Sequence, residues 1–227
     1  MTDQNLTEII CVIDRSGSMG SIRHDAIGGF NTFLEDQKKV TVDKCLLTYT
    51  QFDNEYEVVH ESKPIEDVPP LDESTYEPRG STALLDAIGR TIDDAGKRFA
   101  AMPEEKRPGA VVFVILTDGH ENASRKYAHE KIMNMIQTQR DAYNWQFIFL
   151  AAGQDAIAAG TSLGIGAAFA ANFAHSAKGV HDAYNVVSSN VSNYRGTRCS
   201  SDLQMGDDVS DDAKGKVVGR SSGSLQS

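Results

Sequence analysis

One carboxylate and two hydroxyl groups follow a short apolar run near the start of the chain. Asp14 ends the run, and Ser16 and Ser18 occupy every second position after it. Two more oxygen donors lie further along, Thr82 in a G-S-T sequence and Asp118 in a T-D-G sequence. Oxygen ligands suit Mg²⁺, Mn²⁺ and Ca²⁺, whereas zinc and copper sites use thiolate or imidazole ligands. The residue types therefore indicate a site for a hard divalent cation.

Only two of these five donors are carboxylates, so the charge of a divalent ion is not overwhelmed by its ligands. An ion held mainly by neutral hydroxyls and water stays electrophilic, and it can accept a carboxylate from outside as its last ligand. The composition of the donor set is therefore typical of a site that captures an acidic ligand.

Residues beside these donors could form a rim that selects the ligand. Two arginines could steer an acidic group, and a histidine and a glutamate follow the second aspartate directly. Each also has an ordinary explanation as a solvated surface residue, because charged side chains are mostly exposed. The predicted rim consists of Arg15, Arg79, Ser81, His120 and Glu121.

Some of the same polar residues have a second interpretation as helix caps. Serine, threonine and asparagine side chains satisfy the free N–H groups at the start of a helix. Ser81 or Thr82 could cap the helix that follows them, and Asn122 or Ser124 could cap the next one. Caps alone do not explain the aspartate of the T-D-G sequence, so the metal site is the preferred interpretation.

The donors are positioned by the elements that precede them. Short apolar runs rich in β-branched residues predict strands, and apolar residues spaced by three and four predict helices. Residues 110–117 form the most continuous apolar run, which is typical of a central parallel strand. The predicted strands are residues 6–13, 44–52, 56–60, 110–117, 145–151 and 167–173, and the predicted helices are residues 21–39, 80–99, 125–141, 155–163 and 176–194.

The order of these elements predicts a doubly wound α/β fold, mostly parallel, with one antiparallel edge strand and helices on both faces. The short turn after residue 52 favours a hairpin, which supplies the antiparallel strand. Ligands of such sheets bind beyond the carboxyl ends of the strands, where Asp14 and Asp118 both lie. The chain becomes polar after residue 195, which predicts one domain at residues 1–195 and a disordered tail at residues 196–227.

The composition of the 227-residue chain disfavours several classes of function. Its net charge of −10 and isoelectric point near 5.0 oppose binding to nucleic-acid phosphates. Its three cysteines suggest reduced thiols, and Cys11 and Cys45 stand in apolar runs that predict burial. No segment resembles a signal peptide or is long and apolar enough for a membrane span, so a cytoplasmic protein without membrane attachment is expected.

The D-x-S-x-S sequence at Asp14, Ser16 and Ser18, the threonine of G-S-T and the aspartate of T-D-G resemble the metal-ion-dependent adhesion site of von Willebrand factor A domains. The resemblance extends over residues 6–194 and is intact at all five positions. It implies that Ser16, Ser18 and Thr82 provide hydroxyl ligands to Mg²⁺, with Mn²⁺ or Ca²⁺ as alternatives. It further implies that Asp14 and Asp118 act directly or through water, and that the sheet is Rossmann-like with six strands.

The resemblance also implies a function in protein binding. The ion would bridge the domain to an Asp or Glu side chain of a partner protein. Simple members of this family often serve larger complexes, including ATPase assemblies, and the expected setting is the cytoplasm of a bacterial or phage-infected cell.

The alternative function is a metal-dependent phosphohydrolase with Asp14 at the reaction centre, on a similar α/β sheet. Phosphatases of the haloacid-dehalogenase type also use an aspartate at a strand end. They usually carry a second aspartate two residues later, where this chain has Ser16, and they need a lysine near the phosphate that we cannot identify. The sequence therefore favours a binding protein without enzymatic activity.

Overall fold

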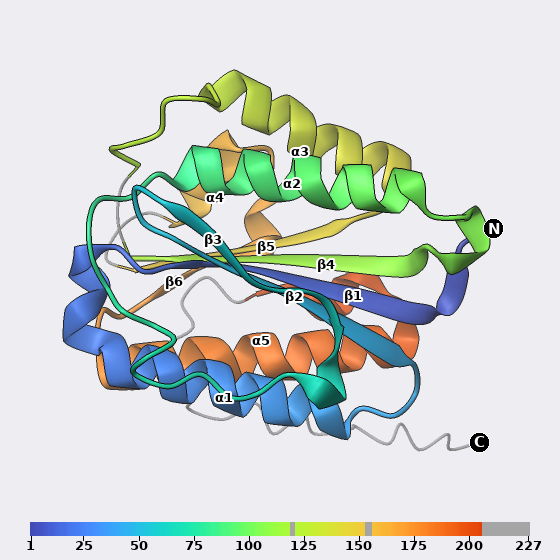
Figure 1. The fold of residues 1–227 in the computed structure, drawn as a ribbon, viewed down its shortest axis with the longest axis horizontal. Helices are drawn as coiled ribbons and strands as arrows, with labels where there is room; N and C mark the ends of the chain where they lie inside the picture. Colours follow the sequence, from blue (N-terminus) through green and yellow to red (C-terminus); the bar gives the residue numbers. More distant parts are fainter. Residues whose placement is uncertain (119–120, 153–155, 206–227) are drawn as a thin grey trace, which may run out of the picture.

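The computed structural model describes residues 1–118, 121–152 and 156–205. Its centre is one six-stranded sheet with the order β3-β2-β1-β4-β5-β6, in which β3 runs antiparallel to β2 and the other neighbours are parallel (Figure 1). The predicted doubly wound sheet with one antiparallel edge strand is confirmed. The strands are β1 (Asp3–Asp14), β2 (Lys44–Phe52), β3 (Tyr56–Pro64), β4 (Pro108–Thr117), β5 (Gln146–Ala152) and β6 (Ala170–Phe173), and the α-helices are α1 (Arg23–Lys39), α2 (Leu84–Ala101), α3 (His129–Tyr143), α4 (Ala156–Ser162) and α5 (Ala177–Thr197).

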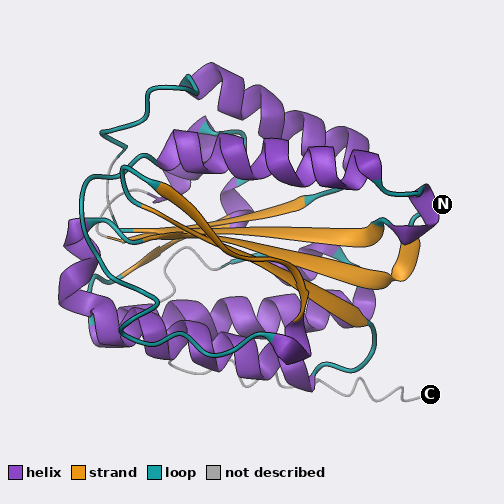
Figure 2. Cartoon of the chain, viewed as in Figure 1, coloured by secondary structure: helices purple, strands orange, loops and turns teal. Residues whose placement is uncertain are grey.

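Helices cover both faces of the sheet, so the molecule has three layers (Figure 2). Helices α1 and α5 lie side by side on one face, and α2, α3 and α4 lie on the other. Each face has its own apolar core, as expected when both sides of a sheet are packed against helices.

Strands β1 and β4 are the central pair, and burial on both faces explains their continuous apolar sequences. Successive side chains point to opposite faces, so Cys11 lies in the core beneath α1 and α5 and Val12 lies in the core beneath α2 and α3. Ile13 pairs with Leu116 in parallel register, which brings both strands to the same edge of the sheet.

The chain leaves the central pair in opposite directions. After β1 it turns into a 3-10 helix, Gly17–Ile22, and then α1 on one face, whereas the chain after β4 leads to α3 on the other face. The connections therefore diverge where β1 and β4 end, which is the point at which doubly wound sheets bind ligands.

Some element boundaries differ from the prediction. Strand β3 continues to Pro64, past residue 60, and α3 begins at His129 rather than at residue 125. Residues 167–169 form a 3-10 turn, and only Ala170–Phe173 pair with the sheet. These differences lie at element ends, where a side chain from elsewhere in the fold often decides the conformation.

The predicted boundary between domain and tail at residue 195 lies too early in the chain. Helix α5 continues to Thr197, and a further 3-10 turn, Ser200–Leu203, follows it. Leu203 and Met205 are buried in the core beneath α1 and α5. The sequence around these two apolar residues is polar, which concealed their packing. Residues 206–227 lie outside the described residues, and the disordered tail there stays a prediction.

Two further expectations concern thiols and membranes. Cys11 and Cys45 are buried and Cys199 is exposed, and all three are free thiols, which confirms the first two as core residues. Among the described residues, no helix combines the length and the apolar character that crossing a membrane requires.

Candidate metal site

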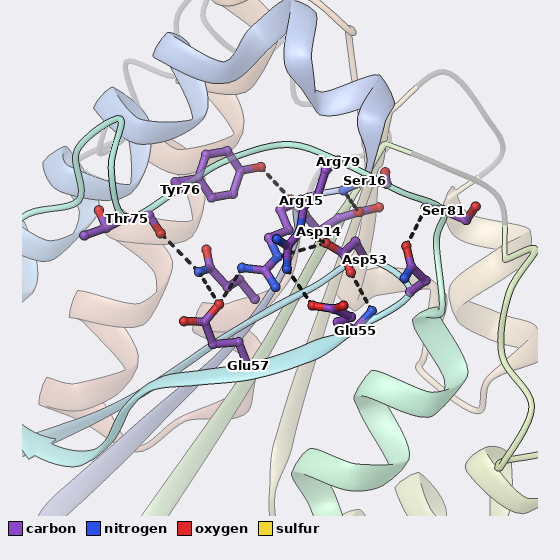
Figure 3. Close-up of polar contacts among 12 residues, drawn as sticks. Asp14, Arg15, Ser16, Asp53, Glu55, Glu57, Thr75, Tyr76, Arg79 and Ser81 are labelled. Carbon is purple, nitrogen blue, oxygen red and sulfur yellow. Dashed lines mark hydrogen bonds and ion pairs between the residues drawn. The ribbon is translucent and has the colours of Figure 1, made fainter.

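Asp14 is the last residue of β1, and its side chain is completely buried. One carboxylate oxygen, Oδ1, accepts a hydrogen bond from the backbone N–H of Ser16 at 2.6 Å. The other, Oδ2, accepts one from the hydroxyl of Thr117 at 2.5 Å. The Tyr76 hydroxyl donates to the backbone carbonyl of Asp14 (Figure 3). The residue is therefore held from three directions at the carboxyl end of the central strands.

Burial is the largest influence on the Asp14 carboxyl group, and it raises the pKa of this group to about 6. The hydrogen bonds from Thr117 and Ser16 lower the pKa, and the negative charge of Asp118 raises it further. A buried carboxylate beside a second carboxylate gains stability from a nearby cation, because the cation offsets both the desolvation and the repulsion.

Ser16, Ser18 and Asp118 bring three oxygens together at this edge. The hydroxyl oxygens of Ser16 and Ser18 are 3.1 Å apart, and they lie 3.4 Å and 2.7 Å from Oδ1 of Asp118. Octahedral Mg²⁺ at about 2.1 Å from each ligand places neighbouring ligand oxygens about 3.0 Å apart. The three oxygens therefore have the spacing of one face of an octahedral coordination shell.

Thr82 lies on the loop that precedes α2, and the residue is buried. The loop lies against the residues after β1, because the N–H of Arg79 donates to the carbonyl of Arg15 at 2.8 Å and the N–H of Gly17 donates to the carbonyl of Gly80 at 3.2 Å. Among the described residues, we find no hydrogen bond that joins the Thr82 hydroxyl to the other four predicted donors. The structure thus brings four donors into contact and places the loop of the fifth beside them.

His175 is a member of this cluster that the sequence interpretation missed. It follows β6, and its Nε2 lies 2.9 Å from Oδ2 of Asp118. Its side chain is 36% exposed, whereas that of Asp118 is completely buried. The available signal was its position after a parallel strand, because all such strands end at the same edge of the sheet.

Two of the predicted rim residues have structural partners instead. Arg15 is 5% exposed in its side chain, and its guanidinium pairs with Asp53 at 3.2 Å and with Glu57 at 2.5 Å (Figure 3). Arg79 is half exposed and pairs with the same Asp53 carboxylate at 2.9 Å and with Glu55 at 2.6 Å. The prediction that Arg15 stands exposed at the rim is wrong, because the turn between β2 and β3 buries it in an ion-pair network.

Glu121 acts at the start of α2. Its Oε2 accepts the N–H of Leu85 at 3.0 Å, and the Ser124 hydroxyl accepts the N–H of Asp86 at 3.0 Å. Helix α2 has Ala83 at its N-cap, so capping by Ser81 or Thr82 is wrong. The residues that perform this role come from the loop after β4, which is distant in sequence and adjacent in space.

The other expected cap and rim residues have mixed outcomes. The N-cap of α3 is Ala128, so neither Asn122 nor Ser124 caps that helix. Ser81 is exposed beside the site, and its N–H donates to the side chain of Asn54 at 3.3 Å. His120 lies outside the described residues, and its predicted role at the rim stays a prediction.

The donor set determines which metals it can hold. The described part of the chain contains no group of three or more His, Cys, Asp and Glu side chains placed to hold a metal. The cluster at the end of β1 combines two carboxylates with serine hydroxyls and a single histidine, His175, and this mainly oxygen set fits a hard cation better than the Cys- and His-rich set of a typical zinc site. The residues present are thus compatible with Mg²⁺, Mn²⁺ or Ca²⁺.

Comparisons with known proteins identify the fold. A scan against protein-family models and a search of curated proteins both found no match. A von Willebrand factor type A protein from Catenulispora acidiphila has a TM-score of 0.50 and 16% identity, and the match covers 88% of this chain and 43% of that chain.

Two other solved structures are similar. The PilB minor pilin from Streptococcus sanguinis has a TM-score of 0.56 and 10% identity, covering 83% of this chain and 62% of that one. Proximal thread matrix protein 1 from the mussel byssus has a TM-score of 0.56 and 14% identity, and the match covers 82% of this chain and 48% of that protein's chain. This chain spans less than two thirds of each of these proteins. Together with the strand order and the flanking helices, the comparisons show that the chain has the fold of von Willebrand factor A domains.

Proposed function

We propose that this chain is a metal-dependent protein-binding module. In this proposal the hydroxyls of Ser16, Ser18 and Thr82 hold Mg²⁺, or alternatively Mn²⁺ or Ca²⁺, and Asp14 and Asp118 act directly or through water. The bound ion supplies a coordination position for an Asp or Glu carboxylate of a partner protein. The observation that carries the proposal is the spacing of three oxygens, two from serines and one from Asp118, at 2.7–3.4 Å.

The charge of the chain supports a bridging role for the ion. With a net charge of −10, the surface repels an acidic partner, and two buried carboxylates lie at the site itself. A divalent ion held by two carboxylates and neutral hydroxyls reverses this repulsion locally, because its charge lies between the carboxylates of both proteins. Removal of the ion should therefore abolish binding rather than weaken it slightly.

The surroundings of Asp14 favour ligand capture over hydrolysis. Both of its carboxylate oxygens accept hydrogen bonds, and its side chain is fully buried. A nucleophilic carboxylate needs a free oxygen in line with the phosphorus atom, within about 3–3.5 Å. The observed contacts instead suit an aspartate that orients the serine loop.

The proposal is tested first by isothermal titration of Mg²⁺ into the wild type and into the double variant Ser16→Ala/Ser18→Ala. We expect saturable binding of one ion to the wild type and loss of that binding in the double variant, which leaves both aspartates in place. Ser189→Ala, at an exposed serine of α5, is the matched control and should bind as the wild type does. Equal binding by the double variant would contradict the proposed ligands.

Partner binding is tested by capture from lysate in Mg²⁺ and in EDTA, with the same three proteins and Asp14→Ala. A partner that carries the acidic ligand should bind the wild type and Ser189→Ala in Mg²⁺ but not in EDTA. Retention of that partner by Asp14→Ala, or in EDTA, would place its binding surface elsewhere on the domain. We further propose that the partner belongs to a larger complex such as an ATPase assembly, which the absence of any ATPase subunit among the captured proteins would contradict.

A further inference from the structure

The two carboxylate oxygens of Asp118 have different neighbours. Oδ1 faces the hydroxyls of Ser16 and Ser18, at 3.4 Å and 2.7 Å, whereas Oδ2 faces Nε2 of His175 at 2.9 Å. The carboxylate is completely buried, so its rotation is limited by these contacts. The histidine and the serines thus contact opposite oxygens of one aspartate.

We propose that His175 is a positioning residue of the metal site. The imidazole Nε2 lies 2.9 Å from Oδ2 of Asp118, at contact distance but without the alignment of a hydrogen bond, and in this proposal the contact turns Oδ1 toward Ser16 and Ser18. The inference rests on the proposed function, because it assigns a residue to the same site. Partners that orient a ligating carboxylate contribute substantially to metal affinity, because the ligand is then already placed when the ion arrives.

The backbone around His175 is built to hold the residue in place. Phe173, two residues before His175, is buried at the end of β6. The following residue, Ser176, is the N-cap of α5, and its hydroxyl accepts the N–H of Gly179 at 3.2 Å. A Cβ atom at Gly179 would lie 2.0 Å from the carbonyl oxygen of Ala174, so the turn requires glycine there. His175 is therefore fixed between a strand end and a helix start.

The contact geometry favours positioning over direct coordination by His175. Nε2 contacts Oδ2 at 2.9 Å, on the side of the carboxylate opposite to Oδ1 and the two serine hydroxyls. A ligand of the same octahedral ion would lie about 3 Å from at least two of the three oxygens Oδ1, Ser16 Oγ and Ser18 Oγ. Direct coordination is accordingly a competing outcome of the test.

The first experiment compares the Mg²⁺ affinity of the wild type with that of His175→Ala and His175→Gln. The alanine variant should bind Mg²⁺ about 10-fold more weakly. The glutamine variant retains an N–H donor and should recover most of the affinity, which a loss of packing alone would not allow. His181→Ala is the control, because His181 is exposed on α5. Unchanged or tighter binding by His175→Ala would overturn the inference, the latter by making His175 a competitor of the ion.

A spectroscopic measurement completes the test. With Mn²⁺ bound, electron spin-echo spectra should lack the strong coupling of a directly bound nitrogen, and its presence would make His175 a ligand instead.

The failure of this inference differs from the failure of the proposed function. If the wild type binds Mg²⁺ through Ser16 and Ser18 while His175→Ala binds equally well, only the inference fails. If the wild type binds no Mg²⁺, or if Ser16→Ala/Ser18→Ala binds normally, the proposed function and the inference fail together.

Discussion

The two aspartates at this edge of the sheet are held in place by different kinds of neighbours. Asp14 is held by neighbours on its own chain segment and on β4, whereas Asp118 is held by residues that lie far from it in sequence. The donor types and their spacing were visible in the sequence. The partners of each donor were not, because a hydrogen bond between distant residues leaves no local pattern.

Arg15 and Arg79 share the Asp53 carboxylate, but their burial differs, and so should their contribution to stability. Arg15→Met removes a buried partner of Asp53, whose own side chain is 1% exposed, and should lower the free energy of unfolding by about 3 kcal/mol. Arg79→Met removes a half-exposed partner of the same carboxylate and should lower it by less than about 1 kcal/mol. Urea denaturation of both variants measures the difference.

The pair of arginine variants also separates a structural role from a role at the partner surface. If Arg15→Met is as stable as the wild type but fails to bind the partner, the assignment of Arg15 to the ion-pair network is incorrect. Arg79 is the better candidate for ligand steering, since half of its side chain faces solvent.

At the scale of elements, the loop after β4 and the start of α2 are linked by reciprocal hydrogen bonds. Glu121 and Ser124 accept N–H groups of the first turn of α2, and Asp86 of that turn accepts the N–H groups of Arg125 and Lys126 at 2.9 Å and 2.8 Å. A third N–H, that of the next residue in the loop, donates to Asp86 at 2.9 Å. The loop therefore replaces the ordinary cap of α2.

Asp86 gives this link a dependence on pH. Burial alone would raise the pKa of Asp86, but three backbone N–H groups hold it below its ordinary value. A lowered folded-state pKa means that the stabilisation is present above the unfolded-state pKa, about 3.9, and is lost as the pH falls below it. Asp86→Asn should cost roughly 1 kcal/mol at pH 7.

Unfolding curves of the wild type and Asp86→Asn, recorded from pH 7 to pH 3, measure this effect. The difference in the free energy of unfolding should begin to shrink as the pH falls below about 4, because the unfolded carboxyl binds a proton there first, and it should be lost as the pH falls through the lower folded-state pKa. A difference that stays constant over this range would mean that the charge of Asp86 does not support the link.

The elements themselves could largely be predicted from the sequence, and their ends could not. The apolar runs of β1 and β4 and the helical spacing of α2 identified each element, because burial imposes these patterns directly. The start of α2 and the start of α3 were misplaced, because both depend on the reciprocal bonds of a distant loop. His175 was missed for the same reason, since its partner lies in another part of the chain.

At the scale of the whole molecule, the strand order places Asp14 and Asp118, with Ser16 and Ser18, at one edge of the sheet, and the loop of Thr82 lies beside them. The alternation of strands and helices predicted a mostly parallel sheet, and the single hairpin predicted the antiparallel edge strand, but the strand order itself comes from the structure. The end of the domain was placed too early because the segment that contains Leu203 and Met205 is polar around two buried side chains. The overall composition of such a segment is polar, so a prediction based on composition misses the few apolar residues in it that pack in the core.

The separation of the donors along the chain determines when the site can form. Ser18 and Asp118 are 100 residues apart, and they meet only after β1 and β4 have paired. Mg²⁺ at 100 times its dissociation constant should stabilise the native state by about 2.7 kcal/mol. We expect the site to form after the transition state for folding, because it needs both strands in place; that free energy should then appear as slower unfolding, by about 100-fold, with the folding rate unchanged.

Stopped-flow unfolding and refolding in Mg²⁺ and in EDTA measure the two rates, and Ser16→Ala/Ser18→Ala should show no difference between the two solutions. An acceleration of folding by Mg²⁺ would indicate that the two strands come together early. If the ion binds as proposed, it would lengthen the lifetime of the folded domain without changing the rate at which the chain folds.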